Sequence, residues 1–200
     1  MVANQYKTFL YIFLYLALLI ILAGCKGPQE IRFTGTDVTG IDINDEAVLM
    51  DHNGRETKLQ DFKDKAIILF FGFTSCPDVC PNTLAKFDLV VEGLGEKADK
   101  VRVIFVSLDP ERDSPDILKT YVTSFNNNFI GLTGTESELS KLAKSYKIFY
   151  QKSFEADGGY TIDHFSGAYL IDNSGRPRVL IGHAQAVGDI VNDVLQILGS

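Results

Sequence analysis

Two short apolar runs constrain the fold of this chain more than any other feature. Residues 66–73 read AIILFFGF and residues 101–108 read VRVIFVSL. Runs of this length are too short for a buried helix and are typical of strands that are covered on both faces in a parallel sheet. A helical pattern from about Pro81 to Leu94 separates them, so the sequence predicts a β-α-β unit with a right-handed crossover.

A strong turn signal, Asn53-Gly54, precedes the first apolar run. Both residues tolerate positive φ, and short runs at Ala47–Met50 and Glu56–Leu59 flank them, so we expect a β-hairpin there. His52 falls in this turn, where we expect an exposed side chain. Residues 26–44 are polar and contain glycines, which indicates a tether with a first short strand near Ile31–Thr34.

Helix signals dominate the second half of the chain. Ser114 before Pro115 is typical of an N-cap followed by the first helical residue, and it predicts a helix to about Phe125. The spacing of Thr135 to Glu138 fits a capping box at the start of another helix. We also expect strands near 147–151, 167–171 and 179–182 and a closing helix over about 186–198. These elements describe an α/β fold, a thioredoxin-like three-layer sandwich with an N-terminal β-hairpin, in a pattern shared with other three-layer folds.

The N-terminal segment has the pattern of an export signal. Residues 9–24 carry no charge and follow Lys7, and this run of 16 residues is shorter than the roughly 20 residues of a membrane span. The run ends in Leu-Ala-Gly before Cys25, which resembles a bacterial lipobox whose cysteine receives lipid. We therefore expect a signal peptide or anchor at 1–24, a tether at 25–44 and a domain at 45–200. Lipidated Cys25 or an uncleaved helix would anchor the exported domain to the outer face of the inner membrane.

Charge and cysteine content exclude several classes of function. The chain has 26 acidic and 19 basic residues, a net charge of −7, and its Lys and Arg residues do not cluster, so we expect no nucleic-acid partner. Cys25, Cys76 and Cys80 are too few for a disulfide scaffold or a paired-knuckle zinc module. The cysteines must therefore serve local chemistry.

Cys76 and Cys80 lie where the first buried strand gives way to a helix, which is the usual position of a site in such a sheet. If residues 76–80 form the first helical turn, the two Cα atoms are about 6 Å apart, which permits a disulfide or two sulfurs on one ion. The helix N-terminus would lower the pKa of Cys76 and favour its thiolate. A merely stabilising disulfide would close a loop too short to remove much unfolded-state entropy. For His164, position alone allows a ligand or an ordinary exposed or hydrogen-bonded side chain.

Three sequence blocks resemble the Sco/SenC family of membrane-anchored copper proteins. They are Phe71-Gly72-Phe73-Thr74 with CPDVCP at 76–81, the stretch from Val106 to Asp113, and Asp163-His164-Phe165-Ser166 followed by Tyr169-Leu170-Ile171-Asp172. The blocks occur in the family's order and spacing, and the resemblance covers about residues 30–199.

This resemblance implies that Cys76, Cys80 and His164 are the ligands of a copper ion. Two thiolates and one imidazole suit three-coordinate Cu(I), whereas Cu(II) would seek a fourth, harder ligand such as water, Asp78 or Asp163. The same ligands plus water can hold Zn(II), so the choice of copper depends on the resemblance. Around the ligands we expect Asp109 at the carboxyl edge of the sheet, and Asp163 can alternatively orient His164.

In function, the resemblance implies a copper metallochaperone for the CuA centre of cytochrome c oxidase subunit II, and not an enzyme with catalytic residues. Other copper chaperones or thiol reductases are further expected partners. The alternative is a thiol–disulfide oxidoreductase that uses Cys76 and Cys80 as a redox disulfide to keep target cysteines reduced. The chain has no Trp for a Trp-Cys-x-x-Cys reductase motif, and Phe73 and Leu69 stand where a peroxiredoxin carries Thr and Pro. A structural lipoprotein with an inert disulfide is a third class.

Overall fold

The computed structural model describes residues 15, 32–43, 45–156 and 158–199. Contacts divide the chain into two units, residues 1–32 and 33–200. Apart from residue 15, the predicted signal or anchor segment at 1–24 lies outside the described residues. Cys25 lies outside them too. In the described part of the chain, no helix is both long and apolar enough to cross a membrane. The second unit begins at Phe33, so residues 33–43, which we expected in the tether, belong to the folded domain.

An eight-stranded sheet with the order β1-β10-β9-β4-β5-β6-β2-β3 forms the middle layer of this domain. The two apolar runs are its central strands, β4 (Ala66–Gly72) and β5 (Val101–Ser107), which pair in parallel as predicted. Every residue of β4 is buried. The remaining strands are β1 (Thr36–Asp37), β2 (Leu49–Asp51), β3 (Glu56–Thr57), β6 (Ile130–Thr133), β9 (Ala168–Ile171) and β10 (Pro177–Ile181). Of these, β6 was missed by the sequence analysis and runs parallel to β5, whereas β9 runs antiparallel to β4.

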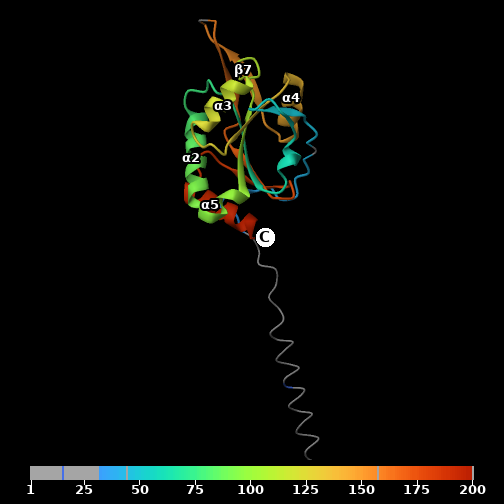
Figure 1. Ribbon diagram of the computed structural model, residues 1–200, viewed down its shortest axis with the longest axis vertical. Coiled ribbons are helices and arrows are strands. Elements are labelled where there is room, and N and C mark those ends of the chain that lie inside the picture. The colour runs from blue at the N-terminus through green and yellow to red at the C-terminus, as the bar shows by residue number, and fades with distance from the viewer. Residues whose placement is uncertain (1–14, 16–31, 44, 157, 200) are drawn as a thin grey trace, which may run out of the picture. The chain divides into compact units, whose positions relative to one another are not determined.

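Helices cover both faces of the sheet, which completes three layers (Figure 1). The helices α2 (Val79–Gly93), α3 (Pro115–Thr123) and α5 (Val187–Leu198) share one apolar core with the inner residues Phe70 and Phe105. The helix α4 (Glu136–Ser145) and the short η1 (Leu59–Phe62) pack on the other face; η2 (Gly95–Lys100) leads into β5. The predicted three-layer α/β architecture is confirmed.

The helix starts follow the sequence signals in part. The Ser114 hydroxyl accepts a hydrogen bond from the Ile117 N–H at 3.4 Å, and the Thr135 hydroxyl accepts one from the Glu138 N–H at 3.2 Å. The Glu138 carboxylate, however, accepts the N–H of Val48 at 3.2 Å. It therefore links α4 to the segment before β2.

The predicted N-terminal hairpin is present as β2 and β3, with Gly54 at φ 77° in the turn. Our expectation of an exposed His52 was wrong, because β2 also pairs with β6 in the main sheet. His52 is buried, its Nδ1 accepts the N–H of Gly131 at 3.0 Å, and its own N–H donates to the Gly131 carbonyl at 2.9 Å.

A second, two-stranded sheet consists of β7 (Tyr150–Phe154) and β8 (Tyr160–His164). It projects from one end of the domain at the top of Figure 1. We predicted a strand near 147–151 but not its partner; Lys147 has φ 57° at the end of α4, so the strand starts later. An isolated two-stranded sheet is marginally stable, so this β7–β8 hairpin depends on contacts with the rest of the domain.

Candidate metal centre

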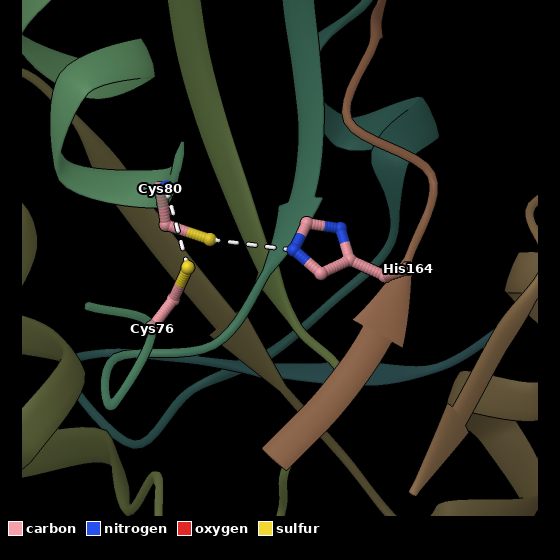
Figure 2. A group of neighbouring side chains, drawn as sticks. All are labelled: Cys76, Cys80 and His164. Atoms are coloured by element: carbon pink, nitrogen blue, oxygen red, sulfur yellow. Dashed lines mark hydrogen bonds between the residues drawn. The ribbon is translucent and has the colours of Figure 1, made fainter. Parts of the chain in front are cut away.

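Cys76, Cys80 and His164 meet beyond the carboxyl end of β4 (Figure 2). Their candidate donor atoms all lie within 4.8 Å of one another. The Sγ of Cys80 lies 3.5 Å from the Nε2 of His164, across a sequence separation of 84 residues. In the described residues, this is the only cluster of three or more His, Cys, Asp and Glu side chains with metal-binding geometry.

The two cysteines belong to different local structures. The helix α2 starts at Val79 after the N-cap Asp78, so Cys76 lies in the preceding loop and Cys80 in the first turn. Residues 76–80 do not form one continuous helical turn, since Asp78 has φ −142° and ψ −67°, so the Cα spacing that assumed such a turn does not apply. The N–H of Cys80 nevertheless donates to the Sγ of Cys76 at 3.4 Å, so the Cys76 sulfur lies at the helix N-terminus.

Cys80 is a fully buried free thiol, and Gly72 makes the space for it. A Cβ atom at Gly72 would lie 2.7 Å from the Cys80 Sγ and 2.7 Å from the Phe105 ring. Burial raises the pKa of the Cys80 thiol, so this sulfur keeps its proton at neutral pH when no cation compensates its charge.

The His164 ring is oriented by its backbone and by two buried phenylalanines. Its Nδ1 is 2.8 Å from the carbonyl oxygen of Phe165. A carbonyl only accepts, so we assign the proton to Nδ1, which leaves the Nε2 lone pair facing the sulfurs. The ring centroid lies 6.3 Å from that of Phe70 and 5.8 Å from that of Phe73, in edge-on arrangements. Burial lowers the pKa of His164, which favours the neutral, metal-binding form.

A buried carboxylate supports the cysteine loop from behind. Asp113 is fully buried and accepts hydrogen bonds from the Thr74 N–H and hydroxyl and from the Ser107 hydroxyl at 2.6 Å. Thr74 and Asp113 both belong to the blocks that resemble the family, but nothing in the sequence indicates that they contact each other. Their common feature, visible only in retrospect, is that each follows the end of a central parallel strand.

The three carboxylates expected around the ligands have separate environments. Asp78 is exposed and accepts a hydrogen bond from Asn82 at 2.6 Å. Asp163 is exposed, and the Nδ1 of His164 contacts the Phe165 carbonyl, the role for which Asp163 was a candidate. Asp109 is fully buried at the carboxyl edge of the sheet, as expected, and binds Arg112 and Tyr160.

The donor set fits a soft metal ion. Around a three-coordinate ion with bonds of about 2.0 to 2.3 Å, donor atoms lie roughly 3.5 to 4 Å apart. The 3.5 Å between Cys80 and His164 already matches this spacing. Two sulfurs and one neutral imidazole nitrogen are ligands that favour Cu(I) over hard cations.

Comparison with known proteins gives the family. The family model described as SCO1/SenC matches residues 38–199. The chain belongs to the SCO1/SenC family. A SCO2-like protein of Rickettsia prowazekii is 39% identical over 130 residues, which are 64% of this chain and 63% of that protein. The chain thus matches just under two thirds of the length of this relative.

Solved Sco structures share the thioredoxin-like fold expected from the sequence. The copper-bound structure of Bradyrhizobium japonicum ScoI is 36% identical to this chain, with a TM-score of 0.72. The match covers 78% of this chain and 99% of the ScoI chain. The copper-bound structure of yeast Sco1 is 28% identical, covers 84% of this chain and 90% of its own, and has a TM-score of 0.71. The match to the SCO1/SenC family model, over residues 38–199, includes Cys76, Cys80 and His164.

Proposed function

We propose that this protein is a copper metallochaperone that binds one Cu(I) through Cys76, Cys80 and His164. The observation that carries the proposal is the convergence of two thiol sulfurs and one neutral imidazole within 4.8 Å. Two family members with this fold have been solved with copper bound, which supports copper over zinc.

Copper binding must displace the proton of Cys80. The thiol is buried and protonated, whereas its thiolate would carry a negative charge with little solvent. A bound Cu(I) supplies the compensating positive charge, and the proton leaves to solvent. His164 is already neutral and contributes its Nε2 lone pair without losing a proton.

We propose the CuA centre of cytochrome c oxidase subunit II as the recipient of the copper. A structure of BsSco, described as a member of the Sco family of cytochrome c oxidase assembly proteins, is 25% identical and covers 84% of this chain with a TM-score of 0.62. Its description supports an oxidase as the target. Other copper chaperones or thiol reductases are proposed as the partners that load or reduce the site.

Anaerobic titration of the domain with Cu(I) tests metal binding directly. We expect one tightly held ion per chain, and loss of tight binding in Cys76→Ser and in Cys80→Ser. Ser137→Ala, in the first turn of α4, is a control far from the three ligands in sequence. Full copper affinity in both cysteine variants would disprove the proposal.

A thiol–disulfide oxidoreductase is the second candidate function. It is favoured by the two free thiols, by the 3.4 Å contact of the Cys76 sulfur with the first turn of α2, and by the disulfide switch described for BsSco. Closing the disulfide removes two electrons and two protons from the dithiol, and these pass to a target disulfide. His164→Ala separates the functions, since exchange needs no imidazole. Normal oxidase activity at limiting copper in this variant would favour the reductase.

We further propose that the domain acts outside the cytoplasmic membrane, tethered by lipid on Cys25. The lipobox-like end of the apolar segment motivates this location. Metabolic labelling with a fatty acid should tag the natural protein and not Cys25→Ala. A membrane-bound but unlabelled natural protein would instead indicate a retained anchor helix.

A further inference from the structure

The β7–β8 hairpin supplies one of the three candidate ligands but does not pair with the main sheet. His164 is the last residue of β8, and Tyr160 is the first. Because side chains alternate along a strand, Tyr160 and His164 lie on the same face of β8. Contacts of Tyr160 therefore hold the first residue of the strand whose last residue is His164.

Tyr160 on β8 is joined to the loop after β5 through Asp109 and Arg112 of that loop. We call these three residues the Arg112 bridge. The Tyr160 hydroxyl donates to the buried Asp109 carboxylate at 2.8 Å. The Arg112 guanidinium forms an ion pair with the same carboxylate, donates through Nη1 to the Tyr160 carbonyl at 2.9 Å, and has its Cζ 3.8 Å from the centroid of the Tyr160 ring. Arg112 thus contacts the side chain and the backbone of Tyr160 at once.

The same guanidinium reaches the aromatic wall of the metal site. Its Cζ lies 5.8 Å from the centroid of Phe73, and the Phe73 ring packs edge-on against the His164 ring at 5.8 Å. Phe73 is buried and directly follows β4. Arg112 therefore contacts the strand that carries His164 and one of the two phenylalanine rings that pack against the imidazole.

Other contacts of the hairpin with this loop are weaker. Lys152 pairs with Glu111 at 2.8 Å, but Glu111 is 62% exposed, and exposed ion pairs contribute little. One nitrogen of Arg112, Nη2, is buried and has no hydrogen-bond partner in the described structure. An unpaired buried donor is unfavourable, so hydrogen bonding alone does not account for the position of this guanidinium.

We propose that Arg112 is a positioning residue for His164, which it holds within reach of the two sulfurs through Asp109, Tyr160 and Phe73. This inference rests on the proposed copper site and adds a residue that touches neither the ion nor its ligands. Lysine at this position would keep the positive charge beside Asp109 but lacks the planar fork that reaches Asp109 and the Tyr160 carbonyl together. The imidazole would then leave the coordination sphere in a large part of the molecules.

Arg112→Lys is the test variant, and Arg55→Lys, an exposed residue at the β2–β3 turn, is its matched control. Pulsed EPR of the Cu(II)-loaded proteins reports whether an imidazole nitrogen is bound. We expect the natural protein and Arg55→Lys to show this signal and Arg112→Lys to lose most of it. Loss of Cu(I) to a chelator should be about tenfold faster in Arg112→Lys, as for other residues that orient a metal ligand.

A double-mutant cycle with His164→Ala separates positioning from general stability. If Arg112 acts through His164, adding Arg112→Lys to His164→Ala should change the rate of copper loss by no more than about twofold. An unchanged nitrogen signal in Arg112→Lys, or equal acceleration in both backgrounds, would overturn the inference. Natural protein that binds no copper would overturn the proposed function as well. Should Arg112→Lys fail to fold, Tyr160→Phe removes one hydrogen bond of the bridge and should cause a smaller loss of the same signal.

Discussion

The Asp113 carboxylate accepts two hydrogen bonds from Thr74, one from the Thr74 backbone N–H at 2.9 Å and one from the Thr74 hydroxyl at 2.5 Å. Thr74 lies two residues before Cys76, so this carboxylate ties the start of the cysteine loop to the segment after β5. The loop that presents one copper ligand is therefore fixed by a residue on another strand connection.

Replacing Asp113 by Ala should destabilise both the domain and the site. The change leaves the Thr74 and Ser107 donors without their buried acceptor, which should lower the free energy of unfolding by about 2 to 4 kcal/mol. Asp116→Ala, an exposed acid two residues into α3, is the control and should cost less than about 1 kcal/mol. Urea denaturation measures both; equal effects would contradict the role given to Asp113.

Gly72→Ala should damage the site from inside the sheet. The new methyl group would lie 2.7 Å from the Cys80 sulfur and 2.7 Å from the Phe105 ring, so both contacts must be relieved by a shift of these side chains or of the backbone. We expect a loss of about 1 to 3 kcal/mol in stability. Copper affinity should fall about tenfold for each 1.4 kcal/mol of strain that Cys80 carries. Gly188→Ala in α5 is the control, because a Cβ there meets nothing within 4 Å.

His52 should make the folded domain sensitive to mild acid. Burial, the main cause, lowers the pKa of His52 in the folded state, so the unfolded chain takes up the proton first. Stability is then fully present above the unfolded pKa of about 6.5 and decreases as pH falls through it. His52→Gln can still accept the Gly131 N–H and should lose less stability between pH 7.5 and 5. Parallel stability curves for the two proteins would refute this, and the similar shift of His164 cancels in the comparison.

Copper affinity should rise with pH. Burial raises the pKa of Cys80, so Cu(I) must displace at least the proton of this thiol. Release of one proton makes the apparent binding constant rise about tenfold per pH unit. Competition with a chelator of known pH dependence, between pH 6 and 8, measures this slope. A flat profile would show that Cys80 is already deprotonated or does not bind.

The two central strands and the start of α3 could be predicted because burial on both faces or a local hydrogen bond determines their residues. The apolar residues of β4 and β5 are covered on both faces, and Ser114-Pro115 starts α3 through a hydrogen bond local to the sequence. By contrast, β6 has only four residues, and one is Gly131, where a Cβ would lie 3.0 Å from the Leu118 Cβ of α3. A tertiary packing need, rather than strand propensity, determines that residue.

The candidate ligands could be named before the structure, and the structure brings them together, but the contacts that hold them could not be predicted. The cysteine spacing indicated a site at Cys76 and Cys80, whereas His164 as a third ligand and copper as the metal were implied by the family resemblance. The hairpin strand β8 was not predicted, because it has only five residues and Ile162 is the one buried side chain among them. The bridge from Arg112 to Tyr160 spans 48 residues and follows from no local pattern.

The separation of β8 from the main sheet also affects how firmly a metal is retained. Two donors belong to the loop and helix that follow β4, whereas the third belongs to the β7–β8 hairpin, which does not pair with the main sheet. A metal bound to all three adds its binding energy to the closure of the hairpin, by linkage. If the hairpin opens locally, we expect copper retention and amide hydrogen exchange in β8 to change together, so that the lifetime of a bound ion would depend on a strand pair remote from both sulfurs in sequence.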